Sequence, residues 1–260
     1  MSGWEMVAVL AAGFAAGGIN AVVGSGTLVS FPVLLAVGIP PVPATISNSL
    51  GLIAGNASGA FGYRRELSGQ GRRLLGLLPA SVLGGLTGAF LLLHLPASTF
   101  EAVVPVLIGL AVVLVAVQPL VQRGLARNRT AALPEVQRVG PGRLAALFGG
   151  AYLTGTYGGY FAASQGVLQI GIFGLLLRES LQRLNALKNV LTLAVNTVAA
   201  GAYVVVATDR IDWTAAALLA GGSLVGGYVS SRYGRRLPEI VLRTAIVVLG
   251  LIAIAVLVNR

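Results

Sequence analysis

Residues 18–37 read GINAVVGSGTLVSFPVLLAV, and residues 158–177 read GGYFAASQGVLQIGIFGLLL. Each stretch is an apolar run that is interrupted by a turn rich in small residues. Shifting the sequence by 140 positions superposes the two turns and aligns Gly26 with Gly166. Two such stretches in one chain predict an internal repeat, and this repeat decides the fold.

The repeat extends beyond these two stretches. The same shift of 140 aligns further polar and aromatic residues, and a shift of 142 aligns others later in each half. The additional pairs are Gly18 with Gly158, Leu28 with Leu168, Asn56 with Asn196, Tyr63 with Tyr203, Ser81 with Ser223, and Leu95-Pro96 with Leu237-Pro238. We therefore expect one membrane domain, in which residues 1–121 and 143–260 are the two repeats and 122–142 is a cytoplasmic linker.

Composition places the repeat in a lipid bilayer. The 260 residues are 56% hydrophobic and 10% charged, with a mean hydropathy of +0.86, whereas soluble domains carry about 25% charged residues. The apolar runs are about 20 residues long, which is the length that a helix needs to cross roughly 30 Å of hydrocarbon. The sequence thus predicts an all-α integral membrane protein.

Charges, prolines and glycine clusters divide the chain into ten helical segments. They cover about 4–23, 26–38, 43–62, 73–94, 98–121, 143–162, 165–178, 184–207, 212–232 and 238–258. The second and seventh are short, as expected for discontinuous helices that do not cross the whole bilayer. Because each repeat contains an odd number of segments, the second repeat is expected to be inverted relative to the first, as in many secondary transporters.

The distribution of basic residues predicts the orientation. The net charge is +10, and the arginines gather between helices rather than on an amphipathic face, which argues against nucleic-acid binding. Four basic segments fall on one side of the membrane, which the positive-inside rule makes cytoplasmic. These segments are 63–73, 123–142, 178–188 and 232–237. Both termini are then expected to be external.

The residues that are missing restrict the chemistry. The chain contains no cysteine and a single histidine, His94, so no cysteine-ligated or multi-histidine metal site is expected, and no cofactor. It also lacks a phosphate-binding Gly-Lys-Ser/Thr motif and a carboxylate near the middle of any span. His94 and Glu101 flank an external turn, where an interfacial role is expected. We therefore do not expect an enzyme.

Two turns are the first candidate binding residues. Gly24-Ser25-Gly26-Thr27 and Ser164-Gln165-Gly166 lie between apolar segments, and each begins a short helix. The free N–H groups and the positive dipole end of such a helix favour an anion. Their equivalent places in an inverted repeat predict that the turns approach each other near the membrane midplane. The alternative is that the glycines only permit close helix packing, and both interpretations stay open.

Two polar stripes are the second group of candidates. Asn48, Ser49 and Asn56 share one face of the third segment, and Lys188, Asn189 and Asn196 share one face of the eighth. These stripes predict either the walls of a substrate path or hydrogen bonds between helices. Lys188 is the only lysine in the chain. It either contributes to a substrate site or extends to the cytoplasmic interface.

The motifs resemble one known family. The run Gly24 to Pro32 followed by Ala44-Thr45-Ile46-Ser47-Asn48-Ser49, and the run Gly155 to Gly166 followed by Leu184-Asn185-Ala186-Leu187-Lys188-Asn189, resemble the sulfite exporter TauE/SafE family. The resemblance implies a permease of the plasma (inner) membrane for small sulfur-containing anions.

On this basis we expect a secondary transporter that exports sulfite or an organosulfonate by alternating access. The expected partners are this small anion and membrane lipid. A channel-like anion pore, a non-transporting membrane scaffold and assembly into a homo-oligomer stay open.

Overall fold

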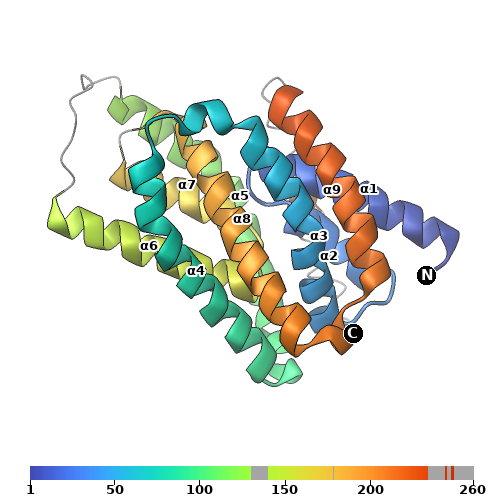
Figure 1. Ribbon diagram of the computed structural model, residues 1–260. Coiled ribbons are helices and arrows are strands. Elements are labelled where there is room, and N and C mark those ends of the chain that lie inside the picture. The colour runs from blue at the N-terminus through green and yellow to red at the C-terminus, as the bar shows by residue number, and fades with distance from the viewer. Residues whose placement is uncertain (130–139, 178, 234–243, 245–246, 249–260) are drawn as a thin grey trace.

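A computed structural model describes residues 1–129, 140–177, 179–233, 244, 247 and 248 (Figure 1). These residues form nine α-helices and two short 3₁₀ helices, and no strand occurs among them. The elements are α1 (Gly3–Val22), α2 (Thr27–Ala36), α3 (Pro41–Gly62), η1 (Arg64–Leu67), α4 (Gly71–His94), α5 (Ala97–Arg129), α6 (Pro141–Tyr160), α7 (Gln165–Leu176), α8 (Leu181–Val206), η2 (Thr208–Arg210) and α9 (Trp213–Tyr233).

These nine helices correspond to the first nine expected segments, with most ends displaced by a few residues. The exception is α5, which was expected to end near residue 121 but continues to Arg129. Its last turns consist largely of Leu, Gln, Ala and Arg, which favour a helix, so the end of an apolar run need not end the helix. Expected segment 238–258 lies outside the described residues apart from 244, 247 and 248.

Among the described residues, four helical stretches are long and apolar enough to cross a membrane. They are Gly3–Val22, Gly71–His94, Ala97–Leu120 and Leu181–Val206. The short helices α2 and α7 have 10 and 12 residues, so at a rise of about 1.5 Å per residue each covers roughly half of the hydrocarbon core. The predicted shortness of both helices is confirmed.

Long helices from the two halves of the chain pack against each other in pairs. α1 lies along α9, and α4 lies along α6 (Figure 1). Small residues permit this proximity: a Cβ at Gly17 would collide with the backbone of Ser223, and one at Gly84 with the backbone of Tyr152. Such contacts allow the van der Waals packing that associates helices in lipid.

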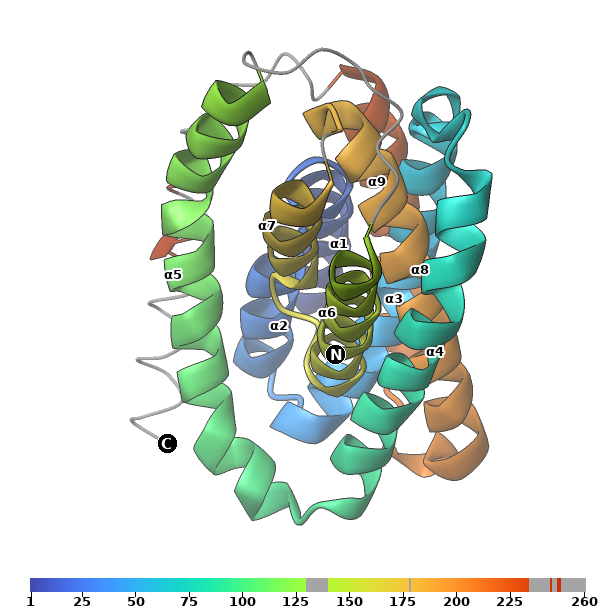
Figure 2. The same ribbon diagram turned by 90° about the vertical axis from the view of Figure 1, so that its left-hand side faces the viewer.

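The short helices lie inside the bundle. In Figure 2, α2 and α7 stand between α5 on one side and α3, α8 and α4 on the other. Phe161, which ends α6, packs edge-on against Phe31 of α2 and Phe100 of α5, with ring centroids 5.2 and 6.0 Å away. All three rings are buried. The turns that precede α2 and α7 are therefore held in the interior.

Two of the basic segments meet at one end of the bundle. Glu179, before α8, accepts hydrogen bonds from Arg73 at 2.8 Å and Arg183 at 2.6 Å. The Arg183 guanidinium also donates to the Ser68 carbonyl at 3.0 Å. Partial burial works to raise the pKa of Glu179, but the hydrogen bonds and charges of the two arginines outweigh it and hold this pKa below its usual value. The α3–α4 and α7–α8 connections are thus tied together.

Candidate functional site

The first turn, between α1 and α2, is held by an asparagine pair. Gly24 has a φ of +90°, a conformation that favours glycine. The Gly26 N–H donates to Asn20 Oδ1 at 3.2 Å, and Asn20 Nδ2 donates to Asn56 Oδ1 at 2.6 Å. Asn56 of α3 therefore reaches the turn through Asn20 of α1.

A second asparagine of α3 fixes the start of α2. Asn48 Nδ2 donates to Thr27 Oγ1 at 3.2 Å, and the Ser30 hydroxyl donates to Asn48 Oδ1 at 2.5 Å. All three side chains are buried. Ser49, the next residue on α3, instead donates to the Thr45 carbonyl of its own helix at 3.0 Å. The structure thus brings Asn48 and Thr27 together but directs the Ser49 hydroxyl to its own helix.

The second turn, between α6 and α7, is strained. Ala162 and Ser164 have φ angles of 65° and 61°, which cost non-glycine residues on the order of 1 kcal/mol each. The Gln165 and Val167 N–H groups donate to the carbonyls of Ala162 and Ser164. These two amides at the start of α7 are therefore already bonded within this turn.

The two turns touch. The Gly166 N–H donates to the Gly24 carbonyl at 3.2 Å. A Cβ built at either glycine would lie 2.6 Å from the Cα of the other, far inside an ordinary contact. The predicted approach of the turns is confirmed as direct contact, and it requires glycine at both positions. Their place near the membrane midplane stays a prediction.

Lys188 lies at the same junction. Its ammonium donates to the carbonyls of Asn20 at 2.8 Å and Ala21 at 3.5 Å, and the Asn189 amide donates to the Ala21 carbonyl at 3.2 Å. These carbonyls belong to the last turn of α1, where a cation complements the helix dipole. The lysine stem passes Gly166, because a Cβ there would lie 2.8 Å from Lys188 Cδ. Lys188 is 1% exposed, so the interpretation that it extends to the interface is wrong.

Several buried polar atoms near these elements have no hydrogen-bond partner among the described residues. They are the Ser25 hydroxyl, both amide atoms of Gln165, Asn56 Nδ2 and Asn196 Oδ1. Buried polar groups in folded proteins are almost always paired. Both turns therefore carry side chains with unused hydrogen-bonding capacity, Ser25 in the first and Gln165 in the second. Asn196 is buried on α8, and none of the hydrogen bonds among the described residues joins its side chain to either turn.

Sequence reasoning missed Asn20, which joins Asn56, the Gly26 amide and Lys188. Its signal was nevertheless present, because a side-chain amide in the apolar run of α1 must find partners. Gln169 of the short helix α7 was also missed. It accepts a hydrogen bond at 3.0 Å from Thr192, which lies on the polar stripe of α8.

Comparison with known proteins identifies the family. The sequence profile described as "Sulfite exporter TauE/SafE" matches residues 9–257. The chain belongs to this family. The TauE/SafE resemblance noted in the motifs is thereby confirmed, and with its apolar helices the chain is a multi-pass membrane transporter.

Two curated relatives of this TauE/SafE chain carry compatible names. A "Probable membrane transporter protein ORF9" of Sinorhizobium sp is 24% identical over 94% of the chain and 88% of the relative. A "Probable membrane transporter protein" of Haemophilus influenzae is 31% identical over 41% of the chain and 42% of the relative. No solved structure gives a significant match.

Proposed function

We propose that the protein is a secondary transporter that exports a small oxyanion, sulfite or a related sulfur anion such as an organosulfonate, across the plasma (inner) membrane. The site lies between the two turns and is exposed alternately to either side. One observation carries the proposal: the turns touch through Gly24 and Gly166, and the buried ammonium of Lys188 lies beside this contact. The family description adds the substrate class.

The helix packing supports two inverted repeats. In the two repeats, α1 to α4 correspond in order to α6 to α9. The contact of α1 with α9 then has its counterpart in the contact of α6 with α4, and both contacts occur. The contact of α3 with α9 likewise has its counterpart in that of α8 with α4. An inverted pair of repeats is the usual basis for alternating access. It places both termini on one side of the membrane, and the basic segments on the opposite side make that side external.

The hydrogen bonds of the junction suggest how an anion is held. Gly166 N–H and the Lys188 ammonium both donate to main-chain carbonyls, which are neutral acceptors. Sulfite oxygens are charged acceptors, and charge-assisted hydrogen bonds are roughly twice as strong as neutral ones. We therefore assign these two donors to the anion once the turns separate.

Side chains complete the proposed site. The Ser25 hydroxyl and the Gln165 amide supply donors that have no partner in the closed junction. Three asparagines hold the turns in place. Asn56 bonds to Asn20 of α1, Asn48 bonds to Thr27 of α2, and Asn189 bonds to the last turn of α1. We assign Ser49 and Asn196 to the walls of the path on α3 and α8.

Sulfite binding to purified protein in detergent tests this assignment. We expect Ser25→Ala, Gln165→Ala and Lys188→Met each to weaken binding by roughly ten- to a hundredfold, because a hydrogen bond to a charged group is worth about 1.5–3 kcal/mol. Thr197→Ala is the matched control on α8, since Thr197 is exposed and bonds only to its own helix. Circular dichroism monitors folding. If only Lys188→Met weakened binding, a point-charge site would replace the two-turn site.

Transport in proteoliposomes separates a carrier from a pore. A carrier with one site that faces each side alternately shows saturable flux and exchanges internal for external sulfite. We therefore expect unlabelled internal sulfite to accelerate the uptake of labelled sulfite. Flux that rises linearly with sulfite concentration, without this exchange, would support the channel-like alternative.

A further inference from the structure

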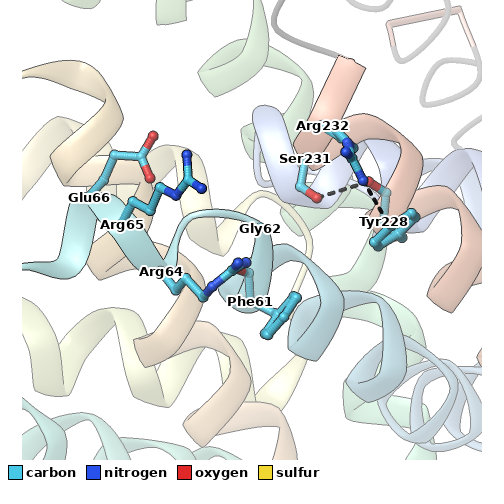
Figure 3. Close-up of a pocket in the computed structure, with 8 residues that line it drawn as sticks. All are labelled: Phe61, Gly62, Arg64, Arg65, Glu66, Tyr228, Ser231 and Arg232. Atoms are coloured by element: carbon cyan, nitrogen blue, oxygen red, sulfur yellow. Dashed lines mark hydrogen bonds between the residues drawn. The ribbon is translucent and has the colours of Figure 1, made fainter.

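A pocket of about 560 Å³ opens at the end of the bundle that carries the basic segments. Figure 3 shows that the end of α3 and η1 form one side of it and the end of α9 forms the other. It is separate from the two turns, because none of its lining residues belongs to them. The proposed transport site does not use it.

The pocket is positively charged. Arg64, Arg65 and Arg232 line it together with a single carboxylate, Glu66. One N–H of Arg64 donates to the Phe61 carbonyl at 3.1 Å, and one of Arg232 donates to the Tyr228 hydroxyl at 3.0 Å. A guanidinium has five N–H donors, so these bonds orient both groups and, within the part of the chain that the structure describes, leave most of their donors available to a ligand.

Aromatic side chains border the same pocket. Phe61 is 58% exposed and Tyr228 is 47% exposed, and the Arg64 guanidinium lies 4.1 Å from the centre of the Phe61 ring. Tyrosine and tryptophan in membrane proteins concentrate at the level of the lipid headgroups, which is where the exposed Tyr228 indicates that the pocket lies. Arginines beside such residues are placed to meet lipid phosphates.

We propose that this pocket binds the phosphate group of an anionic phospholipid in the cytoplasmic leaflet. The planar guanidinium groups match phosphate oxygens, with which arginine forms paired hydrogen bonds. A phosphate held by Arg64 or Arg65 on one side and Arg232 on the other would bridge η1 and α9. The choice of leaflet rests on the proposed orientation, whereas the ligand chemistry does not.

Lipid binding to delipidated protein in detergent tests the proposal. Native mass spectrometry would measure the binding of phosphatidylglycerol, with phosphatidylcholine and inorganic phosphate as separate arms. We expect phosphatidylglycerol to bind more tightly than phosphatidylcholine and to raise the thermal unfolding midpoint. Arg232→Gln should weaken phosphatidylglycerol binding on the order of fivefold, and the triple variant Arg64→Gln, Arg65→Gln, Arg232→Gln on the order of a hundredfold.

Arg72→Gln is the matched control, because Arg72 is an exposed arginine near the same end but outside the pocket. It should leave phosphatidylglycerol binding unchanged. Equal binding of the two lipids, or wild-type binding by the triple variant, would overturn the proposal. Arginine-dependent binding of inorganic phosphate that phosphatidylglycerol does not displace would overturn the lipid source. The assay contains no sulfite, so its outcome is independent of the transport proposal.

Discussion

Gly166→Ala tests whether the contact between the turns is essential. The added methyl group would lie 2.6 Å from Gly24 Cα and 2.8 Å from Lys188 Cδ. The lysine stem can move, but Gly24 is a backbone neighbour in a turn with a positive φ. Overpacking of this kind costs about 1–3 kcal/mol, and loss of the Gly166 to Gly24 hydrogen bond about 1 kcal/mol more. We expect a destabilisation of about 2–4 kcal/mol.

Thermal unfolding in detergent and sulfite flux in proteoliposomes would measure the effect. A loss of this size corresponds to a fall in the unfolding midpoint of roughly 5–15 °C for a chain of this length, and flux should fall with it because the turns can no longer close. Gly171→Ala is the matched control in the same helix, since no atom lies within 4 Å of its Cβ position. If Gly166→Ala behaved like Gly171→Ala in both assays, the two turns would not be in contact.

Three further predictions concern the connections between helices. Because the pKa of Glu179 is held below its usual value, ionised Glu179 stabilises the fold at neutral pH, and this contribution is lost as the pH falls through the lowered pKa. Glu179→Gln should therefore lower the free energy of unfolding at pH 7 by up to about 1 kcal/mol, the range of partly exposed ion pairs, and its thermal unfolding midpoint should match that of wild type in acid. Ala162→Gly should raise the free energy of unfolding by up to about 1 kcal/mol, because glycine relieves the left-handed backbone; a lower thermal unfolding midpoint would contradict the inferred strain. In this cysteine-free chain, an impermeant thiol reagent applied to intact cells should label Ser98→Cys but not Ser68→Cys, and the reverse pattern would invert the proposed topology.

The helices were predictable because apolar runs and their breaks are local properties of the sequence. The short helices α2 and α7 were predicted from apolar runs too short to cross the bilayer. The pattern shared by the turns before them predicted that the two turns approach each other. The extension of α5 to Arg129 was not predicted. Hydropathy marks where a chain leaves the hydrocarbon, whereas helix propensity decides where the helix ends.

The partners of the candidate side chains could not be read from spacing. Asn48 and Ser49 are neighbours in the sequence, yet Asn48 binds α2 while Ser49 bonds within α3. A serine or threonine hydroxyl in a helix can donate to a carbonyl one turn earlier in the same helix. A buried side-chain amide has two donors and an acceptor, and it needs hydrogen-bond partners on other elements. For the same reason Asn20 was identifiable as a residue that needs a partner, but its link to Lys188 depends on how α1 meets α8.

The junction of the turns concentrates features that a purely structural contact would avoid. Ala162 and Ser164 adopt a backbone conformation that glycine would tolerate better. Lys188 is a buried cation, and an apolar residue of similar volume is often equally stable at such a position. The Ser25 hydroxyl and the Gln165 amide are buried without partners among the described residues. Local costs of this kind persist mainly at functional sites.

The gathering of strained backbone, a buried lysine and polar atoms unpaired among the described residues at one place favours ligand binding over close helix packing as the reason for the two turns. On the proposed function, Lys188 is tolerated in the interior because it alternates between two sets of acceptors: the carbonyls of Asn20 and Ala21 in the closed junction, and the oxyanion in the loaded one. On this proposal the anion, as the stronger acceptor, would draw the ammonium away from the end of α1. That movement would remove one link between α1 and α8 and would thereby couple substrate binding to separation of the turns.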